Sequence, residues 1–178
     1  MKKAIGTIVA VLFVFLFSIS AKADINYNLL YNWSLQPPNV QQDLVNKRTN
    51  IQVVDKLPWE SPSLYETYAY TTMNVIPGTL YVNSIDIYIK RSYEFALTHE
   101  VGHAFSNAGN WVYGWCCTPE FINIWQKERY NNAMMPQGMD DIREYFAEAY
   151  DMYIRYPQIL KQANPETFNY IKVVMSFT

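Results

Sequence analysis

The chain has 178 residues, 50% of them hydrophobic, which suffices for one ordinary domain with a buried core. Its 14 basic and 16 acidic residues give a formal net charge of −2, and this balance argues against nucleic-acid binding. Fifteen tyrosines and five tryptophans are a heavy aromatic load, and we expect most of them to fill the core.

The amino terminus has the features of a secretory signal peptide. Two lysines precede an apolar run over residues 4–20, and an A-x-A cleavage site follows at residues 21–23. We expect residues 1–23 to be removed and residues 24–178 to form a single secreted domain without stable membrane association. Removal takes three of the 14 basic residues and none of the 16 acidic ones, which leaves a net charge of −5. Because the apolar run is near the lower limit for a membrane span, an uncleaved anchor is the alternative.

The first half of the mature chain predicts a helix followed by three strands. Two prolines open a helix over about residues 37–47, and a short strand follows over residues 51–54. Residues 68–75 and 79–89 are rich in Tyr, Thr, Val and Ile and are separated by Pro-Gly. This pattern predicts two strands joined by a turn.

The next stretch, residues 97–105, contains the only two histidines of the chain. His99 and His103 are four residues apart and Glu100 follows the first, which forms the sequence HExxH. On a helix both imidazoles lie on one face and can bind one ion, for which zinc is the natural candidate. Glu100 would be close enough to take a proton from the attacking water without binding the metal. Two core histidines satisfied by hydrogen bonds are the alternative.

Local signals predict the helix that carries this motif. Ser92 is a good N-cap, Glu94 falls in the first turn, and Gly109 stands where a glycine would end the helix. Gly102 inside a helix costs about 1 kcal/mol relative to alanine. We therefore expect it to mark close backbone packing beside the site.

Three further helices are predicted over about residues 118–130, 142–155 and 164–175, and residues 131–139 are expected to be irregular. Cys116 and Cys117 are adjacent, and sequence neighbours rarely form an unstrained disulfide. Small buried residues are the simplest interpretation of the pair. A strained vicinal bridge, two free thiols and an intermolecular link are the alternatives.

A catalytic zinc normally takes three protein ligands and keeps one position for water. Glu144, Glu148 and Asp151 recur at i, i+4 and i+7 on one face of a predicted helix, where burial would be costly unless a cation faced them. We predict one zinc ion per chain, bound by His99, His103 and Glu144. Glu148 is expected to orient a ligand histidine through its free ring nitrogen. Asp151 is the fallback ligand, a cysteine ligand is a second alternative, and a solvated acidic face is the third.

The HEVGH sequence, followed about forty residues later by EYFAEA, resembles the catalytic domain shared by anthrax lethal factor and the secreted clostridial Pro-Pro endopeptidases. The resemblance covers about residues 79–156. It implies a small α+β, gluzincin-like metallopeptidase domain with a short sheet packed on the HExxH helix and a helical C-terminal half. It also implies that His99, His103 and Glu144 bind zinc and that Glu100 is the base.

One position departs from the family pattern. The family places an oxyanion-stabilising tyrosine two turns before the third ligand, and here that position is Gln137. Tyr130, the nearest upstream tyrosine, is the predicted catalytic replacement, and Gln137 could itself donate a hydrogen bond.

These patterns predict a secreted, monomeric, zinc-dependent endopeptidase acting on extended polypeptides. We expect the substrate to lie along an exposed strand within residues 79–89, and the resemblance adds proline-rich sites that Trp59, Trp111 or Trp115 would contact. A secreted zinc-binding or adhesin-like module without catalysis is the alternative, and a toxin-type protease acting inside another cell is a second one.

Overall fold

The computed structural model describes residues 26–58, 68–79, 81–107 and 114–177. Predictions that fall outside these ranges are the signal peptide (residues 1–23), the loop at Trp59, the helix end at Gly109 and the role of Trp111. None of the described helices is both long and apolar enough to cross a membrane.

Among the described residues two helices come first, three consecutive strands follow, and the rest of the chain is helical. The helices are α2 (Tyr27–Ser34), α3 (Pro38–Asn46), α4 (Leu97–Asn107), α5 (Pro119–Glu128), α6 (Ile142–Arg155), α7 (Pro157–Ala163) and α8 (Pro165–Val174). The strands are β1 (Thr49–Val54), β2 (Ala69–Val75) and β3 (Val82–Lys90). Three short 3₁₀ helices are η1 (Glu94–Ala96), η2 (Trp115–Cys117) and η3 (Gln137–Met139).

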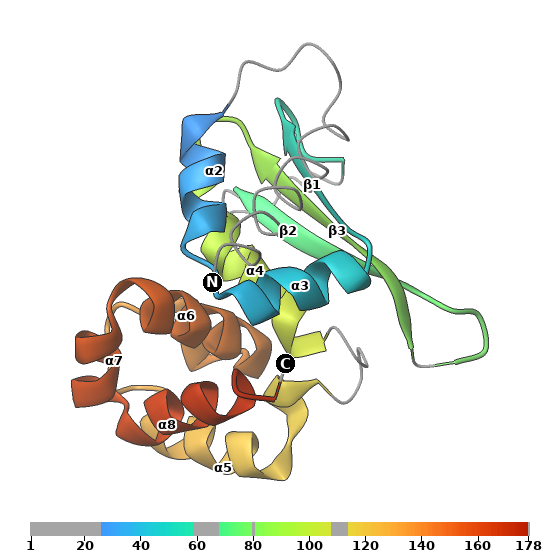
Figure 1. The fold of residues 1–178 in the computed structure, drawn as a ribbon. Helices are drawn as coiled ribbons and strands as arrows, with labels where there is room; N and C mark the ends of the chain where they lie inside the picture. The colour runs from blue at the N-terminus through green and yellow to red at the C-terminus, as the bar shows by residue number, and fades with distance from the viewer. Residues whose placement is uncertain (1–25, 59–67, 80, 108–113, 178) are drawn as a thin grey trace, which may run out of the picture.

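The three strands form one sheet in the order β1-β3-β2, in which β1 runs parallel and β2 antiparallel to β3. Every second residue of β3 faces the core, and Ile85, Ile87 and Ile89 are completely buried. Helix α4 packs against β2 and β3 on one side and against α6 on the other. Figure 1 shows α4 between the sheet and the group formed by α5 to α8. The predicted α+β architecture, with a short sheet on the HExxH helix and a helical C-terminal half, is confirmed.

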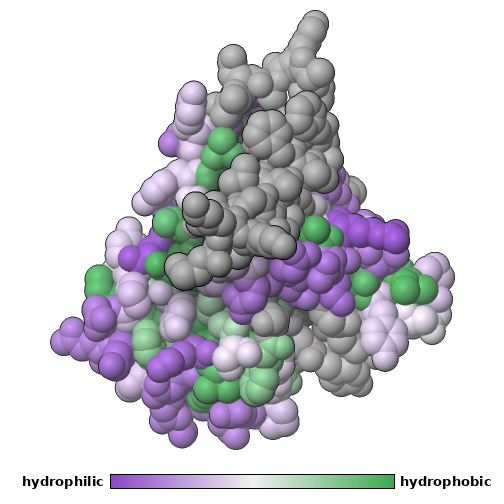
Figure 2. Space-filling view, in the orientation of Figure 1, coloured by the Kyte–Doolittle hydropathy of each residue, from purple (hydrophilic) through white to green (hydrophobic). Residues whose placement is uncertain are grey.

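Most of the predicted elements are present, with their caps. Asp141 opens α6 by accepting a hydrogen bond from the Arg143 backbone, and Thr118 caps α5 in the same way through Phe121. In Figure 2 hydrophilic side chains cover the visible side of α3, which completely buries Val40 on its other side.

Two helices and one cap differ from the prediction. Helix α2 was not predicted, although Asn26 caps it by accepting a hydrogen bond from the Leu29 backbone. Pro157 was expected only to stop α6, but it is also the first residue of α7. Ser92 is not an N-cap: its φ is +74°, and η1 begins after Tyr93 and continues into α4.

The backbones of α4 and α6 approach closely at Gly102, as predicted. A Cβ atom at this position would lie 2.8 Å from the Ala147 Cα and 3.1 Å from the Tyr150 Cβ. Both distances are shorter than ordinary van der Waals contacts, and the first is to the main chain. The absence of a side chain therefore lets α6 approach the helix that carries both histidines.

Gly102→Ala is accordingly expected to destabilise the fold by about 1–3 kcal/mol, the usual cost of overpacking a core. The added methyl group would push α6 away from α4 and move Glu144 away from the histidines, so a zinc ion held by these three residues would be bound less tightly. Chemical denaturation and zinc titration of the same protein preparation measure both effects. A gain of about 1 kcal/mol, the usual result for an unhindered helical glycine, would show that this contact does not constrain the site.

Candidate metal centre

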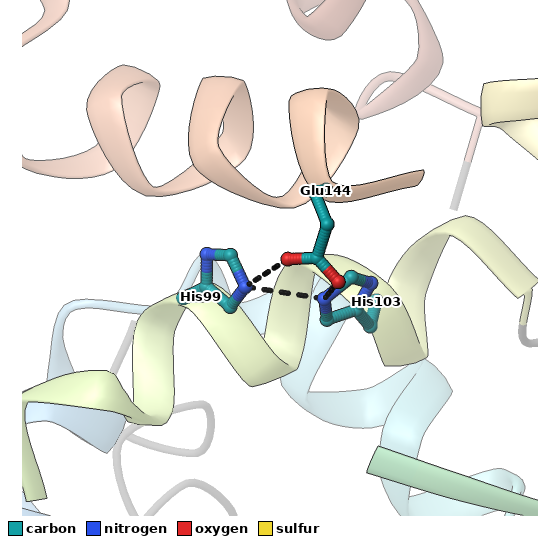
Figure 3. Close-up of side chains that lie close together, drawn as sticks. All are labelled: His99, His103 and Glu144. Atoms are coloured by element: carbon teal, nitrogen blue, oxygen red, sulfur yellow. Dashed lines mark hydrogen bonds and ion pairs between the residues drawn. The ribbon is translucent and has the colours of Figure 1, made fainter. Parts of the chain in front are cut away.

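Two helices that are far apart in the sequence bring His99, His103 and Glu144 together. His99 and His103 lie one turn apart on α4, and Glu144 reaches them from the first turn of α6 (Figure 3). Nε2 of His99 lies 3.2 Å from one carboxylate oxygen of Glu144, and Nε2 of His103 lies 3.4 Å from the other. The two Nε2 atoms are 3.1 Å apart. All three side chains are partly exposed, so an incoming molecule can reach them.

The charges of the three groups depend on one another. Burial opposes ionisation of Glu144, but hydrogen bonds and the charge interactions with His103 and His99 outweigh it and hold its pKa far below the usual value. Burial likewise disfavours a charged His99, but the nearby carboxylates of Glu144, Glu100 and Glu148 outweigh it and raise the pKa of His99. The site therefore attracts positive charge.

The donor set fits a zinc ion. One ligand atom from each of the three residues lies within 4.8 Å of the others, and no other such group of His, Cys, Asp or Glu occurs among the described residues. Two imidazole nitrogens and one carboxylate are the ligands of a well-known class of catalytic zinc sites.

Glu100 lies beside the three candidate ligands but is not one of them. Its side chain is 4% exposed and its carboxylate accepts a hydrogen bond of 2.8 Å from the Thr71 hydroxyl of β2. Burial raises the pKa of Glu100, against the opposing effects of His103, His99 and Thr71, in the absence of a metal ion. Thr71 was not identified from the sequence, because its position 29 residues before Glu100 belongs to no motif.

For Glu148, which was predicted to orient a ligand histidine, the hydrogen bonds among the described residues go to the main chain. Its two carboxylate oxygens accept hydrogen bonds from the backbone N–H groups of Gln137 (3.1 Å) and Gly138 (2.8 Å). Trp125 holds the same short helix by donating to the Gly138 carbonyl oxygen. Glu148 therefore fixes η3 beside the site. The fallback ligand, Asp151, is paired with Arg155 at 2.8 Å and lies outside the three-residue cluster.

The three candidate ligands line a cleft with a volume of about 1240 Å³. The predicted common face of Glu144, Glu148 and Asp151 is confirmed, since all three line this cleft. Its remaining described lining residues are Tyr68, Ala69, Tyr70, Thr71, Met73, Phe95, Ala96, His99, Glu100, His103, Met134, Pro136, Gln137, Asp140, Arg143, Met152 and Tyr156.

The strand that borders the cleft is β2. The substrate was expected to pair with an exposed strand within residues 79–89, which contain most of β3. This expectation is wrong, because β3 is the central strand and already pairs with β1 and β2. Strand β2 is an edge strand among the described residues, and Ala69 and Thr71 line the cleft. Strand order, which decides the edge, depends on long-range pairing that the local pattern does not show.

Two aromatic residues predicted to act at the site lie elsewhere. Tyr130 is 63% exposed, its ring lies against the Arg129 guanidinium at 4.6 Å, and it does not line the cleft. Trp115 stacks on Phe177 instead of facing the cleft. Gln137, the position at which the family pattern has a tyrosine, does line it.

The adjacent cysteines are two free thiols in η2, away from the candidate ligands. Their sulfur atoms are 3.3 Å apart, and Cys116 is completely buried, which raises the pKa of its thiol to about 12. The Cys116 backbone N–H donates to the Ser106 hydroxyl of α4. The simplest interpretation, two small buried residues, holds for Cys116, whereas Cys117 is only partly buried, and the pair are two free thiols, one of the alternatives.

Comparisons with known proteins identify the family and the fold of this chain. Comparison with curated protein sequences finds no significant match. Among solved structures, the Pro-Pro endopeptidase PPEP-2 from Paenibacillus alvei is similar in fold, with a TM-score of 0.56 and 16% sequence identity over 86% of this chain and 94% of that chain. The family described as anthrax toxin lethal factor, N- and C-terminal domain, matches residues 22–174, which extends well beyond the stretch on which the resemblance was based. The chain therefore belongs to the anthrax toxin lethal factor domain family.

Proposed function

We propose that this protein is a secreted zinc-dependent endopeptidase that binds one zinc ion per chain and acts as a monomer. The observation that carries the proposal is the convergence of His99, His103 and Glu144 at a cleft, with the carboxylate of Glu100 held beside them. Family membership and the fold shared with an endopeptidase support the same reaction class.

A zinc ion held by His99, His103 and Glu144 would supply a Lewis acid that polarises the scissile carbonyl and makes water a better nucleophile. Glu100 accepts the proton of the attacking water and delivers it to the nitrogen of the leaving amine. The negative charge that develops on the carbonyl oxygen needs a further hydrogen-bond donor. We assign this role to the Gln137 carboxamide, since Gln137 lines the cleft on the η3 turn that Glu148 fixes.

We further propose that an extended polypeptide binds along β2. The Lys90 backbone N–H donates to the Tyr68 carbonyl, and alternation along an antiparallel pair then directs the main-chain groups of Ala69, Thr71 and Met73 away from β3, toward the outer edge of β2. A substrate strand that pairs with this edge would pass the candidate ligands, and a cleft of about 1240 Å³ accommodates several residues. Proline-containing sites are the first to test, because PPEP-2 is a Pro-Pro endopeptidase.

The second candidate function is a secreted zinc-binding or adhesin-like module that has lost catalysis. The observation that favours it is the glutamine at position 137, because a carboxamide is a weaker donor than a phenol, and because Tyr130 lies outside the cleft. Both candidates require zinc binding, so only a measurement of hydrolysis separates them.

The deciding experiment is digestion of a peptide library by the zinc-loaded and the chelator-treated protein, with the products identified by mass spectrometry. We expect cleavage that disappears on chelation and returns with zinc, with proline-containing sequences prominent among the substrates. Stoichiometric zinc without cleavage of any peptide would support the binding module. Failure to bind zinc at all would exclude both candidates.

A further inference from the structure

Thr71 lies where β2 meets the helix that carries the HExxH motif. Its hydroxyl group is 2.8 Å from the carboxylate oxygen of Glu100 and 3.1 Å from the main-chain oxygen of the same residue. Among the described residues, no other side chain hydrogen-bonds to this carboxylate. The orientation of the carboxylate therefore depends on a single hydroxyl group from the neighbouring strand.

We propose that Thr71 is a positioning residue for catalysis, which holds the Glu100 carboxylate in the orientation required for proton transfer and links it to the strand that binds substrate. This inference rests on the proposed function, because it assumes that Glu100 is the base.

The need for such a residue follows from the flexibility of glutamate. A Glu side chain has three rotatable bonds, and proton transfer requires its carboxylate within hydrogen-bond reach of the reacting water. Glu100 is 4% exposed, so its carboxylate has few water molecules to hold it. A hydrogen bond to a charged group in such a place is strong enough to select one orientation.

The two oxygen acceptors near the Thr71 hydroxyl suit the two protonation states of Glu100. A hydroxyl group has one proton, so it can donate to only one of them fully at a time. While Glu100 is ionised, the shorter contact favours donation to the carboxylate. After Glu100 has taken a proton, the hydroxyl can turn to the main-chain oxygen at 3.1 Å. Thr71 therefore keeps a partner throughout the proton transfer.

The position of Thr71 in the strand links the base to substrate binding. Its side chain points toward α4, whereas its main-chain N–H and C=O point away from β3, toward the outer edge of β2. A substrate paired with this edge would contact the backbone of the residue that holds the base. Substrate register and base orientation are then set by one residue.

The test compares Thr71→Val, which removes the hydroxyl but keeps the shape, with Thr71→Ser, which keeps the hydroxyl. Thr72→Val is the matched control, since Thr72 lies on the opposite face of the same strand and does not line the cleft. We expect Thr71→Val to lower kcat by about 10- to 100-fold with KM changed less than about twofold, because the lost bond acts on the base and not on substrate affinity. Thr71→Ser should restore most of kcat, and Thr72→Val should match the wild type. All variants should retain one zinc per chain.

A structural measurement tests the inference independently of activity. Crystal structures of the zinc-loaded wild type and Thr71→Val should show the Glu100 carboxylate in one orientation in the first and in a different or split orientation in the second. An unchanged carboxylate, or a Thr71→Val protein with wild-type kcat, would overturn the assignment. If the zinc-loaded wild type cleaves no peptide, the proposed function fails, and the two crystal structures still decide whether Thr71 orients Glu100.

Discussion

Glu100→Gln is expected to lower the rate of peptide hydrolysis by about 10²- to 10⁴-fold, the range that general base catalysis usually supplies, while zinc stays bound. Glutamine has the same shape and still offers an oxygen to the Thr71 hydroxyl, so the local packing should survive. It cannot accept a proton from water at neutral pH. The loss should therefore appear in kcat and leave substrate binding almost intact.

The measurement is steady-state cleavage of a peptide identified by the library digest, together with zinc content by atomic absorption. Glu120→Gln is a suitable control, because it makes the same change at an exposed position in α5. Activity within tenfold of the wild type in Glu100→Gln would mean that another group is the base. A loss of zinc together with activity would mean that Glu100 holds the metal.

Glu144→Ala is expected to weaken zinc binding by more than about 100-fold. Loss of a residue that only supports a metal ligand already costs 10- to 100-fold in affinity, and Glu144 supplies the only carboxylate of the three-residue cluster. Without Glu144, both remaining candidate ligands come from α4. A bound ion would then have no protein ligand on the side that faces α6. Hydrolysis should fall in parallel with zinc occupancy.

Competition with a chromophoric chelator measures the zinc affinity of this variant. Glu120→Ala removes an acid from the first turn of α5, as Glu144→Ala does in α6, and so controls for the loss of a helix-start charge. Unchanged affinity in Glu144→Ala would exclude Glu144 as a ligand and would reopen the interpretation of the three acids as a solvated face. Thermal unfolding of the metal-free proteins would show whether the fold itself has changed.

The errors in the sequence-based prediction have different physical origins. Helix α7 was missed because Pro157 ends one helix and begins the next, and the local signal is the same for both. The substrate strand was assigned incorrectly because a sequence pattern predicts strands but not which of them becomes the edge. Tyr130 was assigned to the site because it is the nearest upstream tyrosine. In the structure its ring packs against the Arg129 guanidinium and lies outside the cleft.

The sequence by itself determined the parts of this protein that depend on short-range spacing. The repeat of the α-helix places His99 beside His103 on one face of α4. The same repeat places Glu144 on the face of α6 that lines the cleft. Only the tertiary structure decided that α6 is the element packed against Gly102, that Thr71 holds Glu100, and that β2 borders the cleft. Each of these contacts joins residues at least 29 positions apart, and such contacts follow from how the whole core packs, not from any local pattern.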